Sequence, residues 1–128
     1  MPETIVLTIS ADVALGPKLK ESRTLAVDAY DKISIDVPDQ TTTGLEVEIQ
    51  PGATGSIQLL VVKSSVYGPD LKYTVNAGTD DRVLDEPHVL VGTGSVGLFG
   101  EEPEKLVFTN TTGEDAQIQI LVGRDATP

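Results

Sequence analysis

The densest apolar segment of the chain is residues 56–63, which reads Ser-Ile-Gln-Leu-Leu-Val-Val-Lys. The run is short and rich in branched aliphatic residues, which is typical of a buried β-strand and not of a helix. Strict alternation places Ile57, Leu59 and Val61 on one face and Leu60 and Val62 on the other. A strand that is apolar on both faces lies either at the centre of a two-layered fold or beneath another chain.

The clearest half-buried strand is residues 45–50, where Leu45, Val47 and Ile49 alternate with Glu46, Glu48 and Gln50. Alternation of this kind predicts further strands at 4–9, 71–76, 88–91, 96–99, 105–109 and 117–122, and a long one at 23–37. We expect a tight turn at residues 29–32 to divide that long segment in two. Residues 11–22, which contain Gly16-Pro17, read as a loop.

No window of useful length shows apolar residues at helical spacing with helix caps. About nine short strands separated by Gly, Pro, Asn and Asp predict an all-β protein. We expect residues 1–128 to form one two-sheet antiparallel β-sandwich of jelly-roll type. The predicted core consists of Ile33, Ile35, Leu45, Val47, Ile49, Ile57, Leu59, Val61, Val75, Leu106 or Val107, Ile118 and Ile120.

Composition narrows the partners that this domain could have. The net charge of −11 argues against nucleic acid and against anionic membrane surfaces, because both require clustered Lys or Arg. No apolar run has transmembrane length, and the amino-terminal Met-Pro-Glu-Thr has neither the basic nor the apolar part of a signal peptide. We therefore expect a cytoplasmic or particle-associated protein.

Few residues are available for catalysis or cofactor binding. Cysteine is absent, which excludes disulfides and thiolate metal sites, and His88 is the only histidine. Residues 92–97, Gly-Thr-Gly-Ser-Val-Gly, match the dinucleotide fingerprint literally, but the residues that follow cannot open a helix of useful length. We read this segment as a glycine-rich turn, and we expect no cofactor and no enzymatic activity.

Four acids in one loop, Asp80, Asp81, Asp85 and Glu86, are weak candidates for a calcium site. Their spacing is not that of a known calcium loop, and we favour solvated loop charge as their explanation. Residues 110–112, Asn-Thr-Thr, are a formal glycosylation sequon that we interpret as the start of a hairpin loop.

Two functions from different classes fit these observations. The first is a non-catalytic structural protein that acts by self-association, like the shell, decoration or fibre components of virus or phage particles. The second is a carbohydrate-binding module that uses loops or a sheet face. The scarcity of aromatic rings and the absence of tryptophan weigh against the second, because sugar rings stack on flat side chains.

The apolar outer face predicted for residues 56–63 supplies a candidate interface. Leu60 and Val62 point outward in the alternating register, and Leu121 extends the same patch if its neighbours point inward. A loop of the same chain, or a bulge that reverses the register, would remove this interface. We expect a homo-oligomer with cyclic symmetry, and a trimer by analogy with jelly-roll assemblies.

Overall fold

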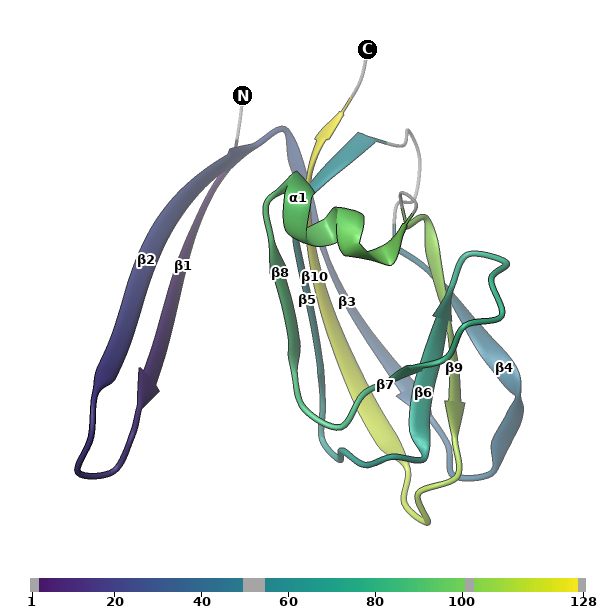
Figure 1. Ribbon diagram of the computed structural model, residues 1–128. Helices are drawn as coiled ribbons and strands as arrows, with labels where there is room; N and C mark the ends of the chain where they lie inside the picture. The colour runs from purple at the N-terminus through teal and green to yellow at the C-terminus, as the bar shows by residue number, and fades with distance from the viewer. Residues whose placement is uncertain (1–2, 50–54, 101–102, 127–128) are drawn as a thin grey trace.

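The structure is a computed structural model that describes residues 3–49, 55–100 and 103–126. It is dominated by two four-stranded antiparallel sheets packed face to face, from which a long hairpin projects (Figure 1). The first sheet has the strand order β3-β10-β5-β8 and the second β4-β9-β6-β7. The strands of the first are β3 (Ala29–Val37), β10 (Ala116–Ala126), β5 (Gly55–Ser64) and β8 (His88–Val91); those of the second are β4 (Thr41–Glu48), β9 (Lys105–Asn110), β6 (Leu71–Val75) and β7 (Arg82–Val83).

This strand order is that of a jelly roll. The first strand of the sandwich, β3, pairs with the last strand, β10, and the second, β4, pairs with the second from the end, β9. Strands β5 and β6 then pair alongside β10 and β9, and β8 and β7 close the two sheets at one edge. Eight antiparallel strands arranged in this way form the double-sheet sandwich that the sequence predicts.

The core lies between the two sheets and is almost wholly aliphatic. Seven of the residues predicted for it are buried there: Val47, Ile49, Ile57, Val75, Leu106, Ile118 and Ile120. Three others, Ile33, Ile35 and Leu45, are partly buried and pack against this cluster. The aromatic rings of Tyr73 and Phe108 complete the core, with their centroids 5.5 Å apart.

The predicted register of residues 56–63 is wrong because of a β-bulge. Ile57 lies opposite Arg124 and Leu59 opposite Gly123, so that Gln58 is an extra residue and the alternation shifts by one. Leu60 and Val62 therefore join Ile57 in the core, with no exposed surface. Buried side chains cannot contact another chain, so neither residue forms the predicted interface.

The bulge also changes the face of two residues that were predicted to be in the core. Val61 points outward and is partly exposed, and it pairs with Leu121 of β10. Leu59 is fully buried but lies outside the cluster between the sheets. Leu121 is partly exposed on the outer face, so among the three predicted interface residues it alone remains accessible.

The hairpin that projects from the sandwich consists of β1 (Glu3–Asp12) and β2 (Lys18–Val27), which pair without interruption from Glu3↔Val27 to Asp12↔Lys18. Most of the loop predicted at residues 11–22 is therefore strand, and only five residues form the turn. The segment 23–37 is divided into two strands as predicted, but the break lies at Asp28, and residues 29–32 belong to β3. The chain passes from the hairpin into the sandwich at Asp28, whose N–H donates to the carbonyl of Arg124 at 3.0 Å.

The glycine-rich segment forms two short helical turns, α1 (Thr93–Val96) and η1 (Gly97–Phe99), in place of the strand predicted at residues 96–99. Gly92 precedes α1 with φ at 87°, a conformation that side-chain-bearing residues rarely adopt. Val96 packs into the core from this connection, whereas Leu98 is exposed. The segment thus covers one end of the sandwich (Figure 1). No helix among the described residues is long and apolar enough to cross a membrane.

Candidate functional site

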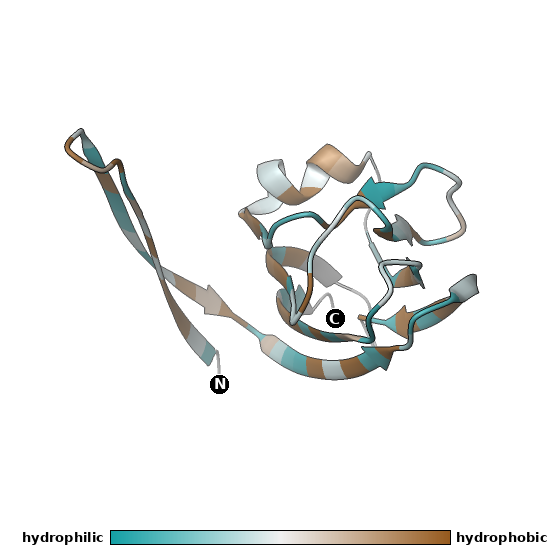
Figure 2. Cartoon of the chain, turned by 90° about the horizontal axis from the view of Figure 1, so that it is seen from below, coloured by the Kyte–Doolittle hydropathy of each residue, from teal (hydrophilic) through white to brown (hydrophobic). Residues whose placement is uncertain are grey.

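The hairpin β1–β2, which we call the arm, is amphipathic along its whole length. The odd-numbered positions of both strands share one face because the register pairs odd residues with odd residues. That face carries Ile5, Leu7, Ile9, Ala11, Leu19, Leu25 and Val27, and its charged residues are Glu3, Glu21 and Arg23, of which Glu21 and Arg23 pair with Ile9 and Leu7. The opposite face is formed mainly by Thr, Ser, Lys and Asp. Figure 2 shows apolar bands along the arm and at its tip.

The base of the arm packs on the outer face of the first sheet. A Cβ atom added to Gly123 would lie 2.9 Å from Cδ1 of Ile5 and 3.4 Å from Cγ1 of Val27. The same point is 3.6 Å from Cβ of Leu59. The missing side chain of Gly123 therefore lets the arm approach the sheet closely, and Val27 and Leu59 become buried at this contact.

Beyond this base the arm is uncovered. Every residue from 8 to 24 is exposed, including the apolar residues Ile9, Leu19 and Val13, which retain 40%, 67% and 57% of their surface. Leu15 at the tip is fully exposed. A two-stranded hairpin with one apolar face is at best marginally stable in water without a third strand or a packing partner. The outer part of the arm therefore has the properties of a contact surface.

The second candidate is a cleft between the two sheets at the edge formed by β7 and β8. Its volume is about 360 Å³, and the apolar residues that line it include Leu90, Leu98 and Phe99, with Val89 at its edge. Arg82 and His88 also line it, and Tyr73 lies at its base. The Arg82 guanidinium lies 5.5 Å from the ring centroid of Phe99, and its Nη2 donates to the carbonyl of Phe99 at 3.3 Å. The cleft thus combines apolar walls with one fixed cation.

Tyr73 and His88 form the one contact in the cleft that resembles a catalytic pair. A hydrogen bond of 2.6 Å joins the Tyr73 hydroxyl to Nδ1 of His88. Burial raises the pKa of Tyr73 to about 12, and the nearby Arg82 charge acts in the opposite direction. A phenol with this pKa stays protonated at neutral pH. The contact ties β8 of one sheet to β6 of the other.

This pKa predicts a loss of stability in alkaline solution. Between pH 10 and 12 the unfolded chain ionises its tyrosine while folded Tyr73 keeps its proton, so stability falls as the pH rises through this window. A shift of about two units corresponds to a loss of about 2–3 kcal/mol. Urea unfolding at several alkaline pH values would measure it, with Tyr73→Phe as the control. The prediction fails if both proteins lose stability equally.

The four acids proposed as calcium ligands do not gather into a metal site. Among the described residues, no group of three or more His, Asp or Glu side chains is arranged to hold an ion. Asp80, Asp81, Asp85 and Glu86 are all exposed and lie along the segment that enters and leaves β7. They surround the strand that supplies Arg82, so they place negative charge beside the cleft.

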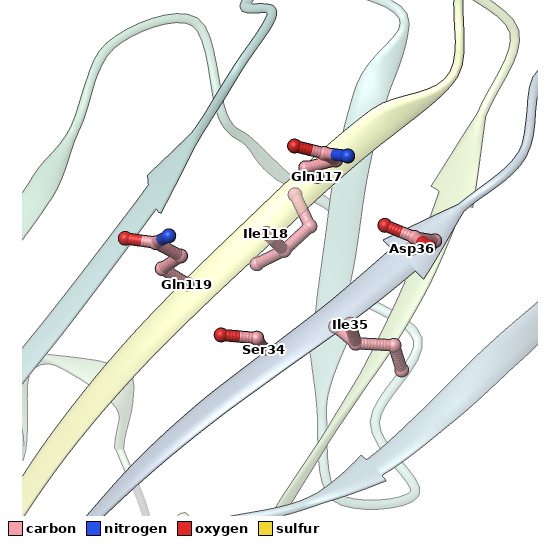
Figure 3. A pocket seen from close by; sticks show the side chains of 6 residues that line it. All are labelled: Ser34, Ile35, Asp36, Gln117, Ile118 and Gln119. Atoms are coloured by element: carbon pink, nitrogen blue, oxygen red, sulfur yellow. The ribbon is translucent and has the colours of Figure 1, made fainter.

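A shallow polar depression of about 260 Å³ lies between β3 and β10. Figure 3 shows Ser34 and Asp36 on β3 and Gln117 and Gln119 on β10, with their polar groups around it. These groups suit the hydroxyls of a sugar, but no aromatic ring lines the depression. The aromatic ring nearest along β3 on this face is Tyr30, which pairs with Gly123 and is 53% exposed.

No protein-family model, curated protein or solved structure matches this chain. The candidate surfaces therefore rest on the geometry of the molecule alone. Sequence reasoning missed the arm because it read residues 11–22 as a loop. Part of the signal was present, since Leu19, Leu25 and Val27 occupy odd positions as Ile5, Leu7 and Ile9 do, but Glu21 and Arg23 interrupt the second series.

Proposed function

We propose that this protein is a non-catalytic assembly protein that associates with copies of itself through the arm. The proposal rests on the amphipathic arm. Its 17 residues from 8 to 24 are all exposed, so no other part of the described chain covers its apolar face there. Contiguous exposed apolar surface on a folded protein marks an interaction site. We expect a cyclic homo-oligomer, with a trimer as the first choice by analogy with other jelly-roll assemblies.

The distribution of charge supports a second copy as the partner. The arm, residues 3–27, carries three of the nine Lys and Arg residues and three of the twenty acids, so its net charge is zero. The whole net charge of −11 therefore lies on residues 28–128. Two acidic sandwiches repel each other, whereas a neutral arm with Lys18, Lys20 and Arg23 in its outer half approaches an acidic sandwich without that cost.

The shape of the molecule supports the same proposal. The arm leaves the sandwich at Asp28 and diverges from it, so the tip is far from the body in both views (Figures 1 and 2). The outer face of the first sheet also keeps exposed apolar residues beyond the arm base, among them Val89 and Leu121. Projecting arms give an assembly contacts that the compact sandwiches could not reach.

The double substitution Ile9→Asp with Leu19→Asp tests the proposal. Both side chains lie on the apolar face of the arm and are exposed, so the changes leave the sandwich core intact. We expect wild-type protein to run above the mass of one chain by size exclusion with light scattering. The variant should run as one chain, or dissociate at a concentration at least about tenfold higher.

The matched control places the same two charges on the polar face of the same strands, with Ser10→Asp and Ser22→Asp. This variant should assemble like the wild type, because its added charges do not enter the apolar face. A wild-type protein of single-chain mass at high concentration would contradict the proposal. So would an assembly that survives the apolar-face substitutions.

A further inference from the structure

The tip of the arm is a compact apolar knob. Residues 13–17 read Val-Ala-Leu-Gly-Pro, and two backbone hydrogen bonds close the turn, from Val13 N–H to the Pro17 carbonyl at 3.0 Å and from Gly16 N–H to the Val13 carbonyl at 2.8 Å. Leu15 sits at the apex with φ at 59°, and its side chain is fully exposed. A closed turn presents this side chain in a fixed position, which lowers the entropic cost of binding.

Cations flank the knob. Lys18 and Lys20 follow it directly on β2. Arg23 lies three residues further along the same strand, on the opposite face. Asp12 and Glu21 are the acids in this part of the arm, so residues 12–23 have a net charge of +1 in a chain of −11. An apolar tip beside cations suits an apolar cavity beside acids.

The cleft between β7 and β8 is such a cavity. Leu98, which is 75% exposed, forms an open apolar rim that nothing else in the described chain covers, and Val89, 42% exposed, lies beside it at the edge of β8. The segment of residues 80–86 that borders the cleft carries four acids and one arginine. Asp80 lies close to the cleft, because it lines a small adjoining depression together with Arg82 and Phe99.

We propose that the arm tip of one copy seats in this cleft of the next copy, with Leu15 against the apolar rim and Lys18 and Lys20 facing the acids of residues 80–86. The inference rests on the proposed function, since it names the surface that receives the arm. The tip projects away from the sandwich of its own chain (Figure 1), and the occupant is a second copy because the acidic sandwich of an identical chain is complementary to the cations beside the tip. The contact is heterologous, so it either closes into a ring or continues as a filament.

A heterologous contact has a distinctive test, which is complementation between two defective variants. Leu15→Asp damages the tip and leaves the cleft intact, whereas Leu98→Asp damages the cleft and leaves the tip intact. Both side chains are largely exposed, so both variants should fold. We expect each variant alone to run as one chain by size exclusion with light scattering. Their equimolar mixture should form a complex of two chains, in which the intact tip occupies the intact cleft.

The charges on the tip and beside the cleft provide a second, independent test. Lys18→Glu with Lys20→Glu should weaken assembly by at least about tenfold. Adding Asp85→Lys and Glu86→Lys to the same chain should restore it, because the signs are then exchanged on both sides. Val6→Asp is the control, since Val6 is exposed on the polar face of the arm and away from the tip, and this variant should assemble normally.

The outcomes separate this inference from the proposed function. If Leu98→Asp assembles like the wild type while Ile9→Asp with Leu19→Asp falls apart, the arm mediates assembly but the cleft does not receive it. If both single variants dissociate but their mixture forms no two-chain complex, the contact is not between tip and cleft. A wild-type protein of single-chain mass overturns both proposals, whether the arm then packs on its own sheet or binds an unrelated molecule.

Discussion

Replacing Leu60 by alanine should lower the free energy of unfolding by about 2–5 kcal/mol, the range for a fully buried leucine. The structure places this side chain in the cluster between the sheets with no exposed surface. The substitution removes its contacts and leaves a cavity that the surrounding aliphatic residues fill only in part. Urea unfolding followed by circular dichroism measures the change. The slope of the transition should stay the same if the folded and unfolded states keep their compactness.

Neighbouring valines provide a matched pair for the same test. Val62 is fully buried in the core and Val61 points outward from the same strand, so Val→Ala makes the same chemical change on opposite faces. We expect a cost of about 2 kcal/mol at position 62 and less than about 1 kcal/mol at position 61. The reverse order would mean that the strand follows simple alternation, with no bulge at Gln58.

The second large effect is expected at Asn110, where aspartate should cost at least about 3 kcal/mol. This side chain has no exposed surface. Its Nδ2 donates to the carbonyls of Val37 at 2.9 Å and Glu114 at 2.8 Å, and its Oδ1 accepts from the backbone N–H and the hydroxyl of Thr112. Because Val37 ends β3 of the other sheet, the amide fastens the two sheets and the β9–β10 loop together. A carboxylate there would face two carbonyls and lose both donors.

Asn76→Asp is the matched control. The Oδ1 of Asn76 accepts from the backbone N–H groups of Glu104 and Lys105 at 2.7 and 3.1 Å, and a carboxylate oxygen accepts equally well. We expect this variant to lose less unfolding free energy than Asn110→Asp, because both acceptor contacts of Oδ1 are kept. Equal losses at the two positions would show that the donor role assigned to Asn110 is wrong. The buried amide also explains why the formal sequon at residues 110–112 reads correctly as a hairpin turn.

The arm shows how a correct pattern leads to a wrong element. Alternation at residues 4–9 and 23–27 predicts strand correctly, but the Gly-Pro pair and the lysines between them suggested a long loop. In the structure β1 continues to Asp12 and β2 begins at Lys18. A hairpin with both edges exposed tolerates polar residues along its whole length, so the lysines and serines do not end its strands. Residues 18–22 could not be distinguished from a loop by local pattern, since Glu21 and Arg23 interrupt the apolar alternation of that strand.

The candidate sites depend on contacts between distant segments, which no local pattern encodes. The cleft brings Tyr73, Arg82 and His88 together with Leu98 and Phe99 from four separate elements. The lone histidine was correctly interpreted as a strand-end residue, and it does begin β8. Its hydrogen bond to Tyr73 depends on how the two sheets pack against each other, which cannot be derived from the local sequence.

The sequence by itself determined the fold class of this protein, because short alternating strands separated by Gly, Pro, Asn and Asp have few stable solutions other than a β-sandwich. It also determined most of the core, since in a half-buried strand such as residues 45–50 the alternation of apolar and polar residues identifies which side chains point inward. Only the tertiary structure decided the register of β5, because the bulge at Gln58 depends on how that strand meets Gly123 and Arg124 of β10. The tertiary structure also decided the position of the arm, since its base is held by contacts with distant residues, among them the close approach to Gly123 and the hydrogen bond from Asp28 to Arg124.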